Sequence, residues 1–299
     1  MSVFVSAGTG KPYGLALVCQ TWGLARSTAY WRRHRRPSDR INMRPGPVGP
    51  CPDSELVEEI KTVLKDSPFH GEGYRKVWAR LRLKGIRTSK RRTLRLMREH
   101  GLLAPHRVGR RHGPKAHDGT ITTDRVDAMW GTDMTSGWTS HEGQAAVFVA
   151  IDHCSAECVG IHASKRADRF QALEPIRQGV RGHFGAFDKG IVANSLKLRH
   201  DHGSQYMSDD FQNEIKFLGL KSSPAFVREP EGNGCAERFI RTHKENLLWV
   251  RSFETIEELR LTLHEFKDNY NNKWLIERHG NKTPAQIREL QTASAKQAA

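Results

Sequence analysis

The sequence lacks long apolar runs, has only five cysteines, and carries few acidic residues in its first two-fifths. No stretch approaches the roughly 18 consecutive apolar residues of a membrane-spanning helix, which excludes a transmembrane segment. The first eleven residues lack the basic stretch and apolar run of a secretory signal. The cysteines are too few and too scattered for a disulfide framework, which favours a reducing cytoplasm.

The shortage of acid makes the charge distribution strongly uneven. Residues 1–123 hold 25 Lys and Arg against 9 Asp and Glu, a net charge of +16. Residues 124–299 hold 23 against 24, a net charge of −1. Such an excess indicates a polyanionic partner, most simply nucleic acid, bound by the first part of the chain. The alternative is a basic surface that only interacts with solvent.

The basic part contains two regions with helical patterns. Residues 1–45 hold two short helices around a turn at Gly23, the second capped by Ser27, which resembles a helix-turn-helix. The Pro- and Gly-rich residues 46–53 predict a linker. Residues 54–104 predict three amphipathic helices, with Leu94 and Met97 turned inward on the third, and therefore a helix-turn-helix DNA-binding domain. Residues 105–123 are expected to be a basic linker.

The outer face of the third helix is rich in cations. Guanidinium and ammonium groups on a helix that can enter the major groove donate to phosphates and base edges. The candidate DNA-binding residues are Lys90, Arg91, Arg92, Arg95 and Arg98. The alternative is a solvated basic face.

From residue 124 the pattern changes to strands that alternate with helices. Strands are expected at 127–135, 145–152, 157–163 and 194–200, and helices at 168–184, 208–218, 234–250 and 255–271. This order predicts an α/β domain over 124–290, with a mixed sheet between helical layers. Residues 291–299 are expected to be a tail.

Three acids lie at the ends of expected elements of this domain. Asp133 is expected to end the first strand, Asp201 follows a short strand, and Glu237 lies in the first turns of a helix. Phosphoryl transfer on a DNA backbone is assisted by two magnesium ions about 3.5–4 Å apart, which prefer carboxylate oxygens. Since the chain has 33 acids, the spacing alone is a weak signal.

The residues around the three acids form recognisable motifs. Trp130-Gly-Thr-Asp133 is W-x-x-D, Asp201-His-Gly-Ser-Gln-Tyr206 is D-x-G-x-x-Y, and Asn233-Gly-Cys-Ala-Glu237 is N-x-x-x-E, with 35 residues between the last two acids. These motifs resemble those of retroviral integrases and of the second-reading-frame transposases of the insertion-sequence-three (IS-three) family. The helix-turn-helix residues from His70 to Leu103 and the closing Thr283-Pro-Ala are also similar to that family.

The resemblance implies a ribonuclease-H-like three-layer core that cuts and joins the DNA ends of a mobile element. It implies that Asp133, Asp201 and Glu237 are catalytic and hold two Mg²⁺ ions, with Mn²⁺ as a substitute. It also implies a homo-oligomer on DNA, a companion first-frame protein, and the bacterial cytoplasm or nucleoid as the location.

The sequence departs from the family pattern at two places. His200 replaces the usual Ser before the second Asp, and Pro230-Glu-Gly-Asn-Gly replaces P-x-D-N-A before Glu237. Neither change removes a carboxylate, so both concern loop geometry.

The helix of Glu237 carries two cations on the same stripe. Arg241 and Lys244 follow Glu237 at i+4 and i+7. In retroviral integrases basic residues at matching offsets contact the viral DNA end, and the resemblance extends this role to Arg241 and Lys244. The alternative is an ordinary Glu–Arg helix pair.

Other interpretations remain open. Cys154 and Cys158, near His153 and His162, suggest zinc, but no second ligand pair follows at finger spacing. Asp152 ends the second strand and is expected to be structural. A plain ribonuclease-H-like nuclease and a catalytically silent DNA-binding regulator derived from a transposase are the competing functions.

Overall fold

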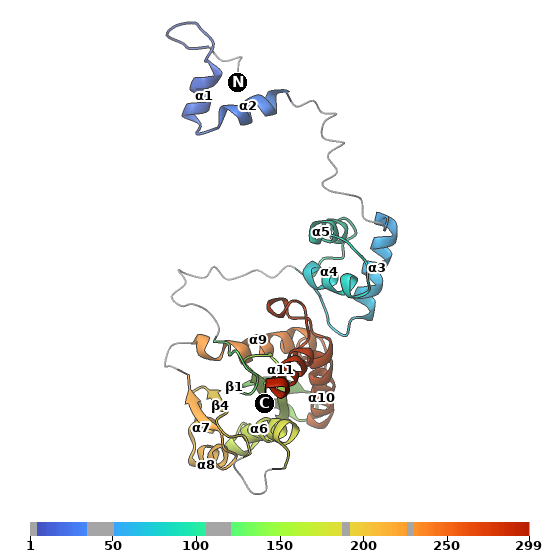
Figure 1. The fold of residues 1–299 in the computed structure, drawn as a ribbon, viewed down its shortest axis with the longest axis vertical. Coiled ribbons are helices and arrows are strands. Elements are labelled where there is room, and N and C mark those ends of the chain that lie inside the picture. Colours follow the sequence, from blue (N-terminus) through green and yellow to red (C-terminus); the bar gives the residue numbers. More distant parts are fainter. Residues whose placement is uncertain (1–4, 35–50, 106–120, 187–191, 226–229, 299) are drawn as a thin grey trace. The chain divides into compact units, whose positions relative to one another are not determined.

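The computed structural model describes residues 5–34, 51–105, 121–186, 192–225 and 230–298 (Figure 1). The chain divides into two compact units, residues 1–52 and 53–299. The first unit contains α1 (Leu15–Thr21) and α2 (Arg26–His34). Gly23 separates them with a φ of 61°, a left-handed conformation that glycine adopts without a steric penalty. The two helices and the turn are present, but α2 begins at Arg26, so Ser27 lies inside its first turn and is not the cap that the sequence predicted.

The second unit begins with the three helices expected of the helix-turn-helix. They are α3 (Asp53–Asp66), α4 (Tyr74–Leu83) and α5 (Lys90–Glu99). Ser89 caps α5, because its side chain accepts a hydrogen bond from the Arg92 N–H at 3.1 Å. The helices enclose a small apolar core that includes Leu56, Ile60, Val77, Leu81, Leu96 and Met97.

One detail of α5 differs from the sequence prediction. Leu94 was expected to face inward with Met97, but Leu94 is only half-buried, whereas Leu96 and Thr93 are buried. The buried side of the helix is therefore centred on Thr93, Leu96 and Met97. The Thr93 hydroxyl is satisfied there by the Ser89 carbonyl at 3.1 Å, so a polar residue occupies a place that the hydrophobic pattern assigns to leucine.

The remaining residues form an α/β domain around a five-stranded mixed sheet. The strands are β1 (Met129–Thr139), β2 (Gly143–Asp152), β3 (Cys158–Ser164), β4 (Lys197–His200) and β5 (Lys221–Pro224). Their order is β3-β2-β1-β4-β5. The first three strands are antiparallel neighbours, while β4 runs parallel to β1, and β5 runs parallel to β4.

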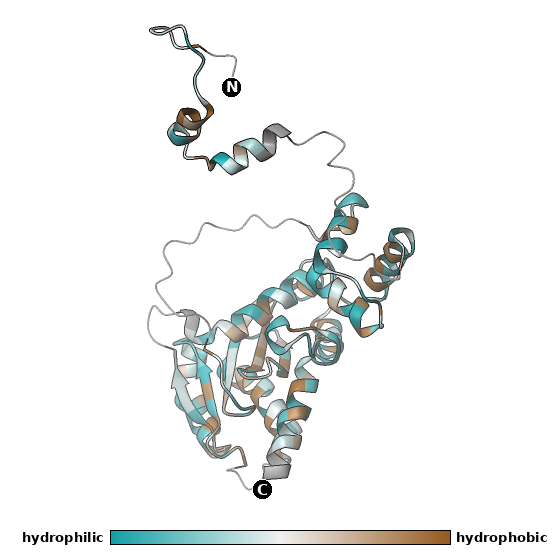
Figure 2. Cartoon of the chain, turned by 45° about the horizontal axis from the view of Figure 1, so that its top comes forward, coloured by the Kyte–Doolittle hydropathy of each residue, from teal (hydrophilic) through white to brown (hydrophobic). Residues whose placement is uncertain are grey.

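Strand β2 shows why the domain has three layers. Its residues alternate between two hydrophobic clusters, because successive side chains of a strand point to opposite faces. Val147, Val149 and Ile151 belong to one cluster, together with residues of α9 and α10. Ala146, Phe148 and Ala150 belong to the other, together with residues of α6 and α8. The sheet thus lies between two helical layers (Figure 1). The helices that cover it carry both hydrophobic and hydrophilic residues (Figure 2).

The elements that cover the sheet follow in chain order. They are α6 (Arg169–Phe184), α7 (Ser204–Met207), α8 (Asp209–Phe217), the 3₁₀ turn η2 (Pro230–Asn233), α9 (Gly234–His243), the π-helix η3 (Lys244–Leu248), α10 (Ile256–Lys273), the 3₁₀ turn η4 (Glu277–His279) and α11 (Pro284–Ala298). Helix α6 approaches β3 closely, since a Cβ atom on Gly160 would lie 1.9 Å from the Pro175 carbonyl oxygen. Only glycine fits at that crossing.

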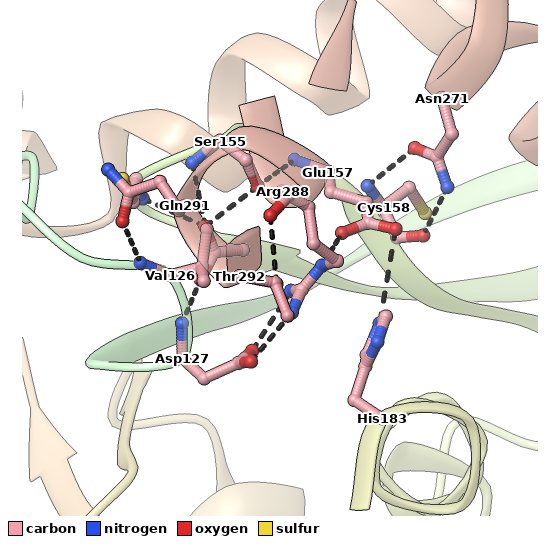
Figure 3. Close-up of polar contacts among 12 residues, drawn as sticks. Val126, Asp127, Ser155, Glu157, Cys158, His183, Asn271, Arg288, Gln291 and Thr292 are labelled. Carbon is pink, nitrogen blue, oxygen red and sulfur yellow. Dashed lines mark hydrogen bonds and ion pairs between the residues drawn. The ribbon is translucent and has the colours of Figure 1, made fainter. Parts of the chain in front are cut away.

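A partly buried polar network attaches α11 to the segments that precede β1 and β3 (Figure 3). The Arg288 guanidinium donates to both carboxylate oxygens of Asp127 at 2.6 and 2.9 Å and also pairs with Glu157. Gln291, one turn further, accepts from the Val126 N–H at 3.2 Å. The helix continues to Ala298 and so includes residues 291–298, which were predicted to be a tail. Residues 291–298 are therefore helical, and the first of them contacts the core.

The helix-turn-helix contributes a residue to a hydrophobic cluster of the α/β domain. Phe69, between α3 and α4, is buried in the cluster that contains α10. Its ring meets Trp274 edge-on at 4.8 Å, and the His70 N–H donates to Asn246 Oδ1 at 2.9 Å. Lys76 of α4 covers the Trp274 ring. Within the second unit, the three-helix region thus has its own small core and contributes Phe69 to the core of the α/β domain.

Of the helices that the structure describes, none combines the length and the apolarity needed to cross a membrane.

Candidate active site

Asp133 lies on β1 in the middle of the sheet, and the residues before it hold the strand in place. It does not end the strand as predicted, because pairing with β2 continues to Thr139. Trp130 is fully buried, and its Nε1 donates to Asp127 Oδ1 at 2.9 Å. A Cβ atom on Gly131 would lie 2.4 Å from Asn233 Oδ1 and 2.6 Å from His153 Nε2. In the W-x-x-D motif, Trp130 thus fixes the strand by burial, Gly131 allows close packing, and Asp133 supplies the carboxylate.

Asp201 follows β4, the parallel neighbour of β1. Gly131 is opposite Arg199, so the continued register places Asp201 beside Asp133 on the adjacent strand. The Gly203 N–H donates to Asp201 Oδ1 at 2.8 Å, and a Cβ atom on Gly203 would lie 2.9 Å from that oxygen. The glycine of the D-x-G-x-x-Y motif therefore keeps the turn compact around the carboxylate.

His200, which stands where the family usually has Ser, is accommodated by stacking and hydrogen bonds. Its ring is fully buried and stacks on Tyr206, with centroids 5.8 Å apart. One ring nitrogen is 2.7 Å from the Asp201 carbonyl, and the other is 2.9 Å from Ser222 Oγ on β5. Burial lowers the pKa of His200, so the neutral imidazole links β4 to β5.

Glu237 lies in the first turn of α9, and Asn233 fixes where that helix begins. Asn233 is buried, and its Nδ2 donates to the Thr132 carbonyl at 2.9 Å. Thr132 directly precedes Asp133, so this bond ties the start of α9 to the strand that carries the first carboxylate. In the N-x-x-x-E motif the amide therefore acts as a positioning residue for Glu237.

Asp133 is close enough to the other two carboxylates to feel the charge of both. Burial raises the pKa of Asp133 to about 6, and the negative charges of Asp201 and Glu237 contribute to the rise. The Met134 N–H and the Lys244 charge oppose it. Burial also raises the pKa of Glu237. None of the three has a Lys or Arg ion-pair partner among the described residues. A set of carboxylates without a protein cation fits a divalent metal ion.

The carboxylates are not fully assembled around one point. Across the described ranges, no group of three or more His, Cys, Asp or Glu side chains is arranged to hold a metal ion. Asp133 Oδ1 accepts from the Met134 N–H at 2.7 Å, and Asp201 Oδ1 accepts from Gly203, so each carboxylate has one oxygen engaged with backbone. The second oxygen of each remains as a donor to a hard cation.

A groove of about 830 Å³ runs along these residues, and we call it the active-site groove. Two of the three carboxylates, Asp133 and Glu237, line it. Apolar and basic side chains of α9 and the residues after it form one wall. The lining residues are His70, Gly71, Pro105, Asp133, Met134, Thr135, Glu237, Ile240, Arg241, Lys244, Glu245, Trp249 and Val250.

The predicted DNA-binding cations lie in two separate places. Arg241 and Lys244 line the groove; Arg241 pairs with Glu245 at 3.0 Å, and Lys244 has no ion-pair partner in the described part of the chain. The other five are on α5, outside the groove lining. Of these, Arg92 and Arg95 pair with Asp53 at 2.5 and 2.6 Å, Lys90 is 3.4 Å from Glu277, and Arg91 and Arg98 are exposed.

The remaining candidates are structural. Asp152 Oδ1 accepts from the Cys154 and Ser155 N–H groups and its Oδ2 accepts from the Asp127 N–H, so it holds the β2–β3 turn. Cys154 and Cys158 are free and buried, and burial raises the pKa of both thiols. Neither belongs to a ligand cluster among the residues described.

Two groove features were missed in the sequence. The positioning role of Asn233 depends on its bond to another strand, which a motif does not reveal. Trp249 lines the groove although the helical period does not place it there. In the sequence, Trp249 could have been noticed as an aromatic residue that shortly follows the basic stripe. The π-helix that directs its ring into the groove has no sequence signature.

Comparison with known proteins identifies the two kinds of domain in the chain. Residues 52–111 match an HTH-like domain, and residues 123–230 and 218–284 match integrase core domains. The chain is 28% identical over 298 residues to the transposase for insertion sequence element IS629 of Shigella sonnei, covering 95% of this chain and 94% of the relative. It is 26% identical over 204 residues to transposase InsD for insertion element IS2 of Escherichia coli, covering 66% of each.

Solved structures of integrases are also similar. The HTLV-2 integrase catalytic core in complex with magnesium is 15% identical, covers 55% of this chain and 98% of its own, and has a TM-score of 0.39. An intasome of simian T-cell lymphotropic virus with the PP2A regulatory subunit B56 gamma is 17% identical, covers 71% and 70%, and has a TM-score of 0.43.

The domain matches and the sheet topology define a polynucleotidyl transferase with an integrase-type, ribonuclease-H-like core and an amino-terminal helix-turn-helix. Along most of its length the chain is similar to the transposases of insertion elements IS629 and IS2.

Proposed function

We propose that this chain is a DNA transposase that cleaves the ends of an insertion element and joins them to target DNA. Asp133, Asp201 and Glu237 are its catalytic residues and the ligands of two Mg²⁺ ions, for which Mn²⁺ substitutes. The observation that supports this proposal is that β1 and α9 bring Asp133 and Glu237 to one groove, while the register of β4 with β1 puts Asp201 beside Asp133. None of the three has an ion-pair partner among the described residues. The transposase relatives and the integrase core support the same activity.

The side chains of the site would have distinct tasks in phosphoryl transfer. When bound, the metal ions would neutralise charge on the phosphate and lower the pKa of the attacking hydroxyl. Asp133 and Asp201 would hold them from adjacent strands and Glu237 from the facing helix. Asn233 would keep Glu237 in register with Asp133 through the Thr132 carbonyl. Lys244, which is free of an acidic partner in the described chain, would bind a phosphate beside the reacting one.

Binding of the rest of the DNA would fall to the basic first part of the chain. Lys90, Arg91, Arg92, Arg95 and Arg98 of α5 would contact element DNA, and Arg241 and Lys244 would contact the end in the groove. We further propose that the chain acts as a homo-oligomer on DNA in the bacterial cytoplasm, together with a companion first-frame protein.

The test separates chemistry from binding along one helix. Glu237→Gln preserves size and helix propensity but removes the metal-binding charge. Cleavage of labelled end DNA with Mg²⁺ should therefore fall by about a hundredfold or more, whereas affinity should remain. Arg241→Ala combined with Lys244→Ala should weaken end binding by about tenfold and leave cleavage at saturating DNA.

The same assay separates the competing functions. A folded Glu237→Gln variant that cleaves normally with Mg²⁺ removes the third ligand from the proposal. Sequence-specific binding by the wild-type protein without any cleavage would identify a silent regulator. Cleavage without joining, on RNA–DNA hybrids as well as on ends, would identify a nuclease.

A further inference from the structure

Trp249 is the most exposed large apolar side chain in the active-site groove. Its side chain is 68% exposed, and Val250 beside it is 51% exposed. The indole has no aromatic neighbour and no hydrogen-bond partner in the described part of the chain. Exposing such a ring to water is unfavourable, and here it lies in the groove that also contains Asp133 and Glu237.

A local change of helix type turns this ring into the groove. Helix α9 continues as the π-helix η3, and the Trp249 N–H donates to the Lys244 carbonyl at 2.9 Å, an i→i+5 bond. Trp249 therefore lies one turn beyond Lys244, on the stripe that begins at Glu237 and Arg241. In a regular α-helix, Leu248 would occupy that place. Leu248 instead packs against the hydrophobic cluster of the core. π-Turns are uncommon and often occur at functional sites.

The surroundings of the ring fit a nucleotide. Lys244 and Arg241 supply positive charge for phosphates, and Met134 and Ile240 give the groove apolar walls. A flat aromatic surface beside phosphate-binding cations is the combination by which proteins hold unpaired bases, because every base has a π-face. A base inside a duplex does not present its face, so the base must be unpaired.

We propose that Trp249 is a stacking platform for an unpaired nucleobase of the DNA held in the active-site groove. The proposal rests on the proposed function, since it requires DNA in that groove. It adds that the enzyme holds the DNA end in a frayed form, with one base stacked on the indole while Lys244 and Arg241 bind the adjacent backbone.

Binding measurements without Mg²⁺ test the platform independently of catalysis. The probe is a synthetic duplex with a short single-stranded overhang, carrying 2-aminopurine in the overhang, compared with a blunt duplex of equal length. The full-length wild-type chain should bind the overhang duplex more tightly and quench the 2-aminopurine. Trp249→Ala should weaken overhang binding about five- to hundredfold and abolish the quenching, leaving blunt-duplex affinity unchanged. Trp249→Phe should retain most of the preference.

Trp138→Ala is the matched control. Trp138 is 69% exposed on β1 but does not line the groove, so its removal should alter neither affinity nor quenching. A Trp249→Ala variant that keeps the overhang preference overturns the platform. A variant that instead only loses self-association identifies Trp249 as a contact between copies, which also overturns it. Loss of the preference in a protein that shows no Mg²⁺-dependent cleavage supports the platform while contradicting the proposed catalysis.

Discussion

Helices α5 and α9 both carry basic stripes, yet their charges are arranged differently. On α5, Arg92 and Arg95 share the acid Asp53, and Arg95 pairs again with Glu99 at 2.8 Å. On the stripe that starts in α9, Lys244 has no ion-pair partner among the described residues, and it lies in a groove with carboxylates. Arg241, the other cation of that stripe, pairs with Glu245 at 3.0 Å. The two stripes therefore differ at Lys244, whose charge is not balanced by an ion pair in the described part of the chain.

This difference indicates what each stripe contributes to DNA binding. A cation that leaves an acid to bind a phosphate exchanges one exposed ion pair for another, and such pairs contribute only about 0–1 kcal/mol. The α5 stripe is therefore suited to exchangeable, salt-dependent contacts. The α9 stripe lies beside the half-buried Asp133, where an electrostatic contact is screened less by salt. We therefore expect this stripe to contribute to the position of the reacting end rather than to overall affinity.

The strongest test of this comparison removes the α5 stripe. Replacing Arg91, Arg92 and Arg95 with Ala should weaken DNA binding by about a hundredfold at low salt, and the log–log salt slope should fall by about one unit per lost phosphate contact. A single substitution of Arg92 or Arg95 should reduce DNA affinity less than substitution of the exposed Arg91, because Arg92 and Arg95 already form ion pairs with Asp53. The measurement is a salt titration of affinity.

A matched triple variant at Lys165, Lys216 and Lys221 removes the same charge from exposed positions of the catalytic domain. If both triple variants change the slope equally, only net charge matters, and the contrast between α5 and the rest of the surface is lost.

The inner side of α9 allows a second test, of stability rather than binding. His243 is fully buried against Phe239 and Phe266, and neither ring nitrogen has a hydrogen-bond partner among the described residues. Burial lowers the pKa of His243 from 6.5 to about 3. The unfolded chain therefore binds the proton more readily, and the free energy of unfolding decreases as the pH falls from about 6.5 towards 3.

His243→Phe should remove this acid sensitivity. At pH 5.5 the folding equilibrium constant should rise about tenfold, about 1.4 kcal/mol, relative to its change at pH 8. Denaturant titrations at the two pH values measure it. His141→Gln, at an exposed position, should leave the pH dependence unchanged. An identical pH profile for wild type and His243→Phe would show that the inner face of α9 does not set acid stability.

The smallest expected effect concerns Asp53, the acid that pairs with two arginines of α5. Arg95 and Arg92 lower the pKa of Asp53, so this acid is ionised and competes with DNA for both cations. Asp53→Ala should tighten DNA binding by a few-fold and steepen its salt dependence. Glu58→Ala, on the same helix but paired with Lys61, is the control and should change less. Weaker binding by Asp53→Ala would mean that Asp53 orients the two arginines rather than competing for them.

The strands that carry the candidate site could be predicted from the sequence, because their hydrophobic patterns are clear. The apolar run at 145–152 predicts β2, and the pairing of β1 with β2 and β4 then places Asp133 and Asp201 on neighbouring strands. Asp168 was included in the predicted helix and is in fact its cap, accepting from two N–H groups. Local hydrogen bonding and periodicity were sufficient there.

Features that depend on distant partners were not predicted. The sequence Lys-Ser-Ser-Pro of β5 has no strand pattern, and it is a strand because β4 offers an unpaired edge. The helix expected over 234–250 is continuous in its apolar period, yet it changes to a π-helix after His243 and ends at Leu248. Helix α11 is held by Arg288, whose acidic partners lie more than a hundred residues earlier.

Phe69 has a consequence for how this protein can be divided or recombined. Its ring is 5% exposed and fills part of the apolar cluster of the catalytic domain, against Phe266 and Trp274. A fragment that starts at residue 121 would leave those two rings uncovered and would lose the His70–Asn246 bond next to the groove. Chimeric transposases made from this chain should therefore be joined before residue 53, where the compact unit begins, so that the helix-turn-helix and the core are inherited together.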